Sequence, residues 1–186
     1  DMLLDEFVPV YQFNEVHRIA IRAPADSIFR ALEEGTFAEI PLTKFLLEIR
    51  SLPRLLSWRR GVTFTASQPF LKWAASAGFV VLAEETNREI VLGLIGQFWK
   101  ILGGSFPRVI NAEAFVTFNR PGYAKAAINF CLEGVHGVHG SNLRTETRIY
   151  VSDPIARKKF AGYWRLISFG SAITRREWLR AVKHRA

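Results

Sequence analysis

The stretch LRTETRIYVSDPIARKKFAGYWRLI, residues 143–167, decides the fold, because its side-chain period changes at one point. Up to Val151, apolar or threonine side chains alternate with charged ones, which is typical of a strand with one buried face. Asp153 and Pro154 then offer an N-cap and a first-turn proline for a helix. The sequence therefore predicts a strand over 143–151 followed directly by a long helix.

The expected helix has one apolar side, which would pack on a sheet. A kink is expected at Gly170. The stripe consists of Phe160, Trp164, Ile167, Trp178 and Val182.

A second decisive stretch, NEVHRIAIRAPADSIFRALE at residues 14–33, begins with a short alternating run. The alternation puts His17 on one face with Ile19 and Ile21, and Arg18 with Arg22 on the other. Pro24 then fits the first turn of a helix.

Between these stretches the pattern predicts helices over 37–50 and 69–77 and an ambiguous strand at 61–66. Residues 79–99 read as a hairpin that turns at Asn87-Arg88, and residues 111–133 as a second hairpin. Both faces of the first hairpin are apolar, so one face needs a cover from residues 53–78 or from a second copy of the chain.

The order of strand, helix pair, antiparallel hairpins and long helix resembles the helix-grip fold of the START-related SRPBCC superfamily. The resemblance is carried by HRIAIRAPADSIFRAL (17–32) and by residues 143–167. The superfamily includes pollen-allergen-like proteins, lipid-transfer domains and polyketide cyclases/dehydrases, and the chain looks like a bacterial branch of unassigned function. The resemblance implies one α+β domain over 1–186, a curved antiparallel sheet around a long C-terminal helix, and an apolar small-molecule site between them.

The register predicts which side chains face that site. If the first strand pairs with the last, His17 lies beside Thr145 or Thr147 on the concave face. A histidine there either hydrogen-bonds its neighbours, which we favour, or serves as an acid/base group. The expected ligand-binding residues are His17, Ile19, Val81, Leu92, Leu94, Phe115, Phe130, Thr145, Thr147 and Trp164.

Glu85 and Glu113 also fall on the concave face by register, so Glu85 joins His17 as a catalytic candidate. Carboxylates of this kind more often sit at strand ends in contact with water. The charged residues of TETR, Glu146 and Arg148 with Arg144, alternate onto the convex face. We interpret them as a solvent-facing charge ladder with Arg18 and Arg22.

Charge and composition limit the classes of binding partner that we expect for the chain. Most of the net charge of +8 lies in residues 153–186, which carry nine Lys/Arg against two acidic residues. We interpret this as a solvated basic helix face and expect no nucleic-acid partner, because the helix aromatics belong to the buried stripe. No apolar run reaches the length of a membrane span. A lone Cys131 and an N-terminus without signal-peptide order favour the cytoplasm.

No phosphate loop, nucleophile elbow or paired cysteine motif is present, so no cofactor is expected. His136 and His139 in GVHGVHG lack further ligands and do not predict a metal site. The leading hypothesis is a binder or carrier of an apolar small molecule that is lipid-, polyketide- or aromatic-like. The alternatives are a polyketide cyclase/dehydratase-type enzyme using His17, and a protein-interaction or dimerisation module.

Overall fold

The predicted strand and long helix follow one another in the computed structural model. The structure describes residues 2–36, 69–100, 103–134 and 141–186. β5 (Ser141–Val151) leads into α6 (Pro154–Arg185), which runs unbroken through Gly170. The carboxylate of Asp153 accepts a hydrogen bond of 2.8 Å from Ala156 N, so Asp153 is the N-cap.

Five antiparallel strands form one sheet in the order β1-β5-β4-β3-β2. The sequence-distant β1 and β5 pair as expected, with His17 opposite Thr145. Asn87, in the left-handed region with φ 58°, lies in the predicted turn between β2 and β3. The remaining strands are β1 (Phe13–Ile21), β2 (Val80–Glu85), β3 (Glu89–Gly96) and β4 (Ala124–Glu133).

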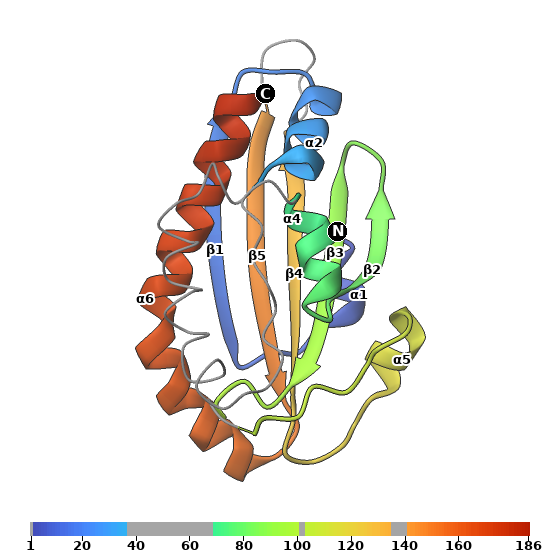
Figure 1. The fold of residues 1–186 in the computed structure, drawn as a ribbon, viewed down its shortest axis with the longest axis vertical. Helices are drawn as coiled ribbons and strands as arrows, with labels where there is room; N and C mark the ends of the chain where they lie inside the picture. The colour runs from blue at the N-terminus through green and yellow to red at the C-terminus, as the bar shows by residue number, and fades with distance from the viewer. Residues whose placement is uncertain (1, 37–68, 101–102, 135–140) are drawn as a thin grey trace.

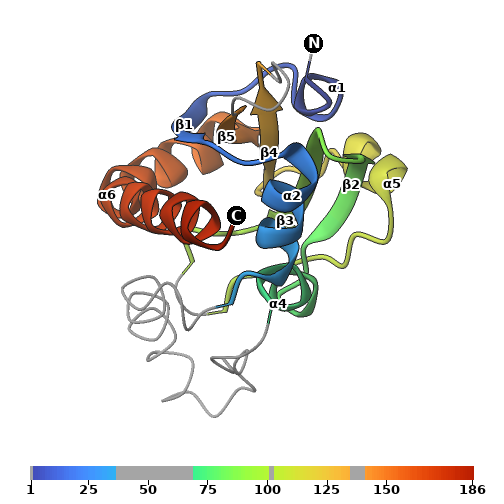
Figure 2. The same cartoon turned by 90° about the horizontal axis from the view of Figure 1, so that it is seen from above.

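The concave face of the sheet is covered by α6, α2 (Ala25–Glu34) and α4 (Phe70–Ser76), as Figures 1 and 2 show. Ile28, Phe29 and Leu32 of α2 are buried in a core that also contains Trp178 and Val182 of α6. This is the α+β helix-grip arrangement that the sequence predicts, a five-stranded antiparallel sheet packed against a long C-terminal helix.

The convex face is covered by segments of the same chain. α1 (Leu4–Phe7) and α5 (Ala112–Thr117) lie on this side (Figure 2). They enclose a second core with Val91, Ile95 and Ala127, in which Leu4 and Phe115 are fully buried. The cover that the apolar hairpin needed is therefore supplied by α1 and α5, neither of which was predicted for this role.

The predicted strand at 111–118 is wrong, because these residues include helix α5. The side chain of Asn111 accepts a hydrogen bond of 2.8 Å from Ala114 N, which caps a helix rather than starting a strand. Both sides of β4 are already paired, with β3 and with β5, so residues 111–118 could not pair beside β4 as the predicted hairpin requires. At Gly93, an added Cβ would lie 2.9 Å from Phe115, so glycine permits the close packing of α5.

An irregularity between Val81 and Ala83 changes the predicted face of Glu85. Beyond it, Glu85 pairs with Glu89 and not with the concave residues Ile90 or Leu92. Helix 69–77 is confirmed by α4. The predicted helix at 37–50 and strand at 61–66 lie outside the described residues.

Candidate functional site

α6 is fixed to the concave face near its first turns. Phe160 is 1% exposed and packs against Phe13 of β1, with ring centroids 4.9 Å apart. Trp164 stacks on Phe160 at 5.9 Å and is partly buried. Ile149 of β5 belongs to the same apolar cluster. The first residue of β1 and the end of β5 therefore both pack against this part of α6.

A second apolar cluster fixes the last turns of α6. Trp178 and Val182 are buried against Ile21 of β1 and Leu143 of β5. Between Phe160 and Trp178, α6 contributes no buried side chain in the described structure. The helix is therefore held at two places, with a less tightly packed middle.

Polar side chains occupy the strand positions between the two apolar clusters. Glu15 pairs with Thr147 and His17 with Thr145, so the four lie on one face of adjoining strands. Arg175 reaches them from α6, donating from Nη2 to Thr147 Oγ1 at 3.1 Å. We call these five residues the inner polar cluster. It lies where α6 has no buried side chain to offer.

The ionisable side chains of the inner polar cluster are largely shielded from solvent. Nε2 of His17 and Oε1 of Glu15 are 2.5 Å apart, and both side chains are about nine-tenths buried. Burial lowers the pKa of Arg175 to about 10, although the negative charge of Glu15 opposes this shift. The guanidinium remains a cation at neutral pH, but an imperfectly solvated one.

Two oxygens of the cluster have no hydrogen-bond partner in the described structure. They are the second carboxylate oxygen of Glu15, Oε2, and the hydroxyl of Thr145, both buried. Arg175 has one described acceptor for its five N–H groups. Buried polar atoms are nearly always paired, so the cluster has unused capacity both to accept and to donate hydrogen bonds.

Most other predicted ligand-binding residues do face the concave side. Leu92 and Phe130 are buried in the core beneath α2 and α6, and Ile19 packs against its edge. Leu94 is buried opposite Ala126. Trp164 adjoins the cluster around Phe160. Val81 pairs with Leu92 but is 51% exposed at the sheet edge, so it forms no buried wall.

Three predicted residues are misplaced. Phe115 is buried in the core of the convex face, because it belongs to α5. Glu85 is exposed and holds Arg88 with a closest ion-pair distance of 2.8 Å, so it does not point toward His17. Glu113 is exposed in the first turn of α5.

Glu15 and Arg175 were missed, although the sequence carries a signal for each. Glu15 precedes His17 by two residues in a strand, which puts both on the same face. Arg175 lies three residues before Trp178 and seven before Val182, in register with the apolar stripe of the helix. The interpretation of residues 153–186 as a solvated basic face includes Arg175 and is wrong for this residue.

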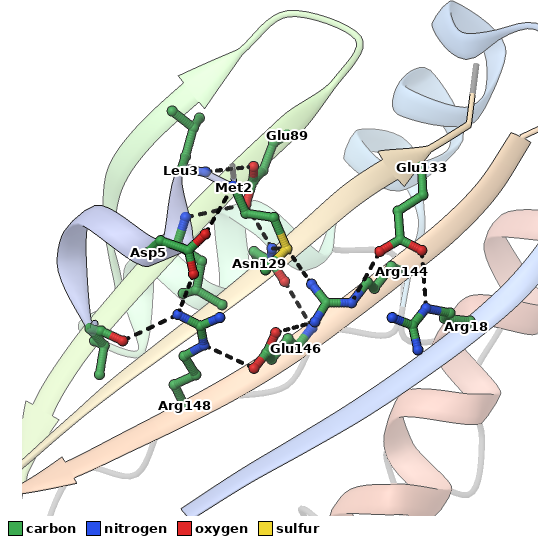
Figure 3. A network of polar contacts seen from close by, with 12 residues as sticks. Met2, Leu3, Asp5, Arg18, Glu89, Asn129, Glu133, Arg144, Glu146 and Arg148 are labelled. Carbon is green, nitrogen blue, oxygen red and sulfur yellow. Dashed lines mark hydrogen bonds and ion pairs between the residues drawn. The ribbon is translucent and has the colours of Figure 1, made fainter. Parts of the chain in front are cut away.

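Three members of the predicted ladder on the convex face are buried instead of solvent-facing, whereas Arg18 and Arg22 are exposed. Arg144, Glu146 and Arg148 are 7%, 2% and 6% exposed. Glu146 accepts from both arginines, with Arg148 Nε at 2.8 Å. The N-terminal segment lies across this part of the sheet (Figure 3), which is consistent with the burial of these three side chains.

The N-terminal segment completes this outer network with its own polar groups. Arg148 bonds Asp5 at 2.7 Å, and Glu89 accepts from Leu3 N at 2.8 Å and from Asn129 Nδ2 at 2.6 Å (Figure 3). Burial raises the pKa of Glu146, but the bonds and charges of both arginines outweigh it, so the pKa is lowered overall. Each charged group is paired, which indicates a structural role.

Other classes of site were sought in the described structure. No group of three or more His, Cys, Asp or Glu side chains there is placed to bind a metal ion. None of the described helices combines the length and hydropathy required to traverse a bilayer. His136 and His139 lie outside the described residues.

No protein-family model matches the chain, and no curated protein matches it. Three solved structures resemble it over most of its length. Protein MLL2253 from Mesorhizobium loti has 14% identity and a TM-score of 0.40, covering 94% of this chain and 99% of its own. CalU16 from Micromonospora echinospora has 13% identity and a TM-score of 0.31, and the match covers 92% of this chain and 82% of CalU16. Ara h 8.0201 has 11% identity and a TM-score of 0.26, and the match covers 92% of this chain and 95% of Ara h 8.0201. These likenesses concern the fold alone.

Proposed function

We propose that the chain binds an apolar small molecule whose polar end reaches the inner polar cluster, between the concave face of the sheet and the middle of α6. One observation carries this proposal: the buried oxygens of Glu15 and Thr145 lack hydrogen-bond partners in the described structure, between two apolar clusters. Unpaired buried polar groups cost stability, so their presence favours a site that a ligand completes.

The available groups indicate the chemistry of the ligand. Arg175 offers N–H donors to an oxygen acceptor such as a carboxylate or carbonyl. Glu15 offers an acceptor to a ligand hydroxyl. Ile19 and Trp164, on either side of the cluster, offer apolar surface to the body of the molecule. A lipid-, polyketide- or aromatic-like molecule with an oxygenated end meets these requirements.

The test is a titration with a fluorescent long-chain fatty acid and with its methyl ester. The native chain should bind both, and the acid more tightly. Arg175→Met should weaken binding of the acid by roughly tenfold or more, since a hydrogen bond to a charged group contributes about 1.5–3 kcal/mol. Binding of the ester should change little.

Arg176→Met is the matched control, because Arg176 is the adjacent and exposed cation of α6. It should bind both probes like the native chain. If the native chain bound neither probe, or if both variants lost the acid equally, the proposal would be wrong.

The contact between His17 and Glu15 favours an enzyme as the second candidate. A carboxylate 2.5 Å from an imidazole nitrogen can orient the ring, as in general acid/base catalysis. A cyclase- or dehydratase-type reaction would need such proton transfer. We rank this function second, because the same contact also satisfies a purely structural histidine.

His17→Gln separates the two functions. Without acid/base chemistry, probe affinity should be largely kept and no turnover of metabolites from a cell extract should depend on His17. Turnover by the native chain that falls by about 10²–10⁴-fold in His17→Gln, with unchanged probe affinity, would establish the enzyme instead.

A further inference from the structure

The side of α6 that faces away from the sheet carries exposed apolar residues. Leu166 and Phe169 are each 77% exposed, and Ile155 is 71% exposed. At about 100° per residue, all three project opposite to the buried Phe160 and Trp178. We call these three residues the outer stripe. In the described part of the chain, α6 packs on the sheet and α2 through Phe160, Trp178 and Val182, which lie on its other side.

Cations surround the outer stripe. All are exposed, and none forms an ion pair within the described structure. The helix contains a single acidic residue, Glu177. We call the following residues the basic flank: Lys158, Lys159, Arg165, Arg176 and Arg180.

We propose that this face of α6 docks on the surface of an anionic lipid bilayer. Leu166 and Phe169 would enter the boundary between headgroups and acyl chains, while the basic flank meets the negative headgroups. A helix with apolar residues between cations lies in the plane of such a surface. This proposal is independent of the ligand site, because none of the residues in the inner polar cluster lies on this face.

Charge and hydropathy favour a bilayer over the other occupants. A nucleic acid would satisfy the cations, but it would leave Leu166 and Ile155 without an apolar partner. A second copy that docked by the same face would cover the stripe, but it would bring two basic flanks together. An anionic bilayer is complementary to both features.

The experiment is co-sedimentation of the full chain with vesicles at neutral pH. One set is phosphatidylcholine alone, and the other is phosphatidylcholine mixed with phosphatidylglycerol. The chain should bind the mixed vesicles and bind phosphatidylcholine weakly. Rising salt should reduce binding, because surface charges are screened beyond about 10 Å at ordinary ionic strength.

Two double variants test the two features separately. Arg165→Gln with Arg176→Gln should weaken binding to the mixed vesicles by about 30-fold, since each cation near such a surface is worth about 1 kcal/mol. Leu166→Ser with Phe169→Ser should weaken it by roughly tenfold or more through lost apolar burial. The four substituted residues are all exposed, so both double variants should have the native free energy of unfolding in urea.

Matched controls distinguish binding by this face of α6 from effects of net charge and of nonspecific apolar adsorption. Arg22→Gln with Arg108→Gln removes the same charge from exposed positions elsewhere, and Ile110→Ser removes an apolar side chain that is 73% exposed. Both should bind the mixed vesicles like the native chain. Equal losses in variants and controls would overturn the proposal. So would a native chain that binds duplex DNA but no vesicles, or one that forms a dimer which Leu166→Ser with Phe169→Ser dissociates.

Discussion

Arg175→Met should leave the chain as stable as before or make it more stable, unlike most substitutions of a partly buried arginine. Burial lowers the pKa of Arg175 from its ordinary value to about 10. At about 1.4 kcal/mol per pKa unit, keeping the charge costs the folded state on the order of 3 kcal/mol at neutral pH. Because the pKa is lowered, this cost is present below pH about 10 and disappears above it.

The cost is partly offset by the hydrogen bond to Thr147. A bond to a charged group contributes about 1.5–3 kcal/mol, and methionine keeps much of the apolar stem. The net expectation is a change between zero and a gain of about 2 kcal/mol in the free energy of unfolding. A residue retained at such a cost in stability is typical of a binding site.

Arg148→Met provides the comparison, because the same substitution removes a guanidinium from the outer network. Arg148 bonds Glu146, Asp5 and the carbonyl of Val8. Its loss leaves Oε1 of the buried Glu146 carboxylate without its partner, while Arg144 keeps Oε2, and should cost about 3–5 kcal/mol. Urea unfolding at neutral pH measures both variants. If Arg175→Met cost as much as Arg148→Met, Arg175 would be structural and our reasoning about the inner polar cluster would fail.

Three further predictions concern the fold. Trp178→Ala should cost about 3–5 kcal/mol in urea unfolding, and Trp164→Ala clearly less, because only Trp178 is fully buried; equal losses would contradict the two-cluster description. Because the pKa of Glu146 lies below its ordinary value of 4.5, its contribution is complete above that pH and lost as pH falls through the lowered pKa. Acid unfolding curves of Glu146→Gln should therefore be flatter in that range than those of the native chain. Asp153→Ala should lower the free energy of unfolding by about 0.5–2 kcal/mol through loss of the helix cap, which calorimetry would detect.

The elements that the sequence predicts well are those whose period persists. β1, β5 and α6 have long, unmixed patterns, and their pairing followed from the order of elements. Residues 111–118 failed because alternation and a helical period both fit so short an apolar stretch. The helix is favoured by the Asn111 cap and by the pairing of both sides of β4 with β3 and β5, and the second of these is not visible in a local pattern.

The candidate site was half predictable for a similar reason. The sequence predicts that His17, Thr145 and Thr147 share a face, because side-chain alternation within each strand is local and the pairing of β1 with β5 follows from the order of elements. Arg175 was overlooked because a cation in a basic segment is usually solvated, and its burial depends on where α6 docks. The same assumption misplaced the convex charges, whose burial depends on residues 2–8, more than a hundred positions away (Figure 3).

The most direct test of the ligand site is nuclear magnetic resonance of the chain during titration with decanoate. The methyl signals of Thr145 and Thr147 and the ring signals of His17 report on the inner polar cluster, while the ring of Phe169 reports on the outer face of α6. We predict saturable shifts at His17 and the two threonines that are lost in Arg175→Met. Shifts confined to Phe169, or equal shifts in the native chain and in Arg175→Met, would contradict a ligand site between the sheet and α6.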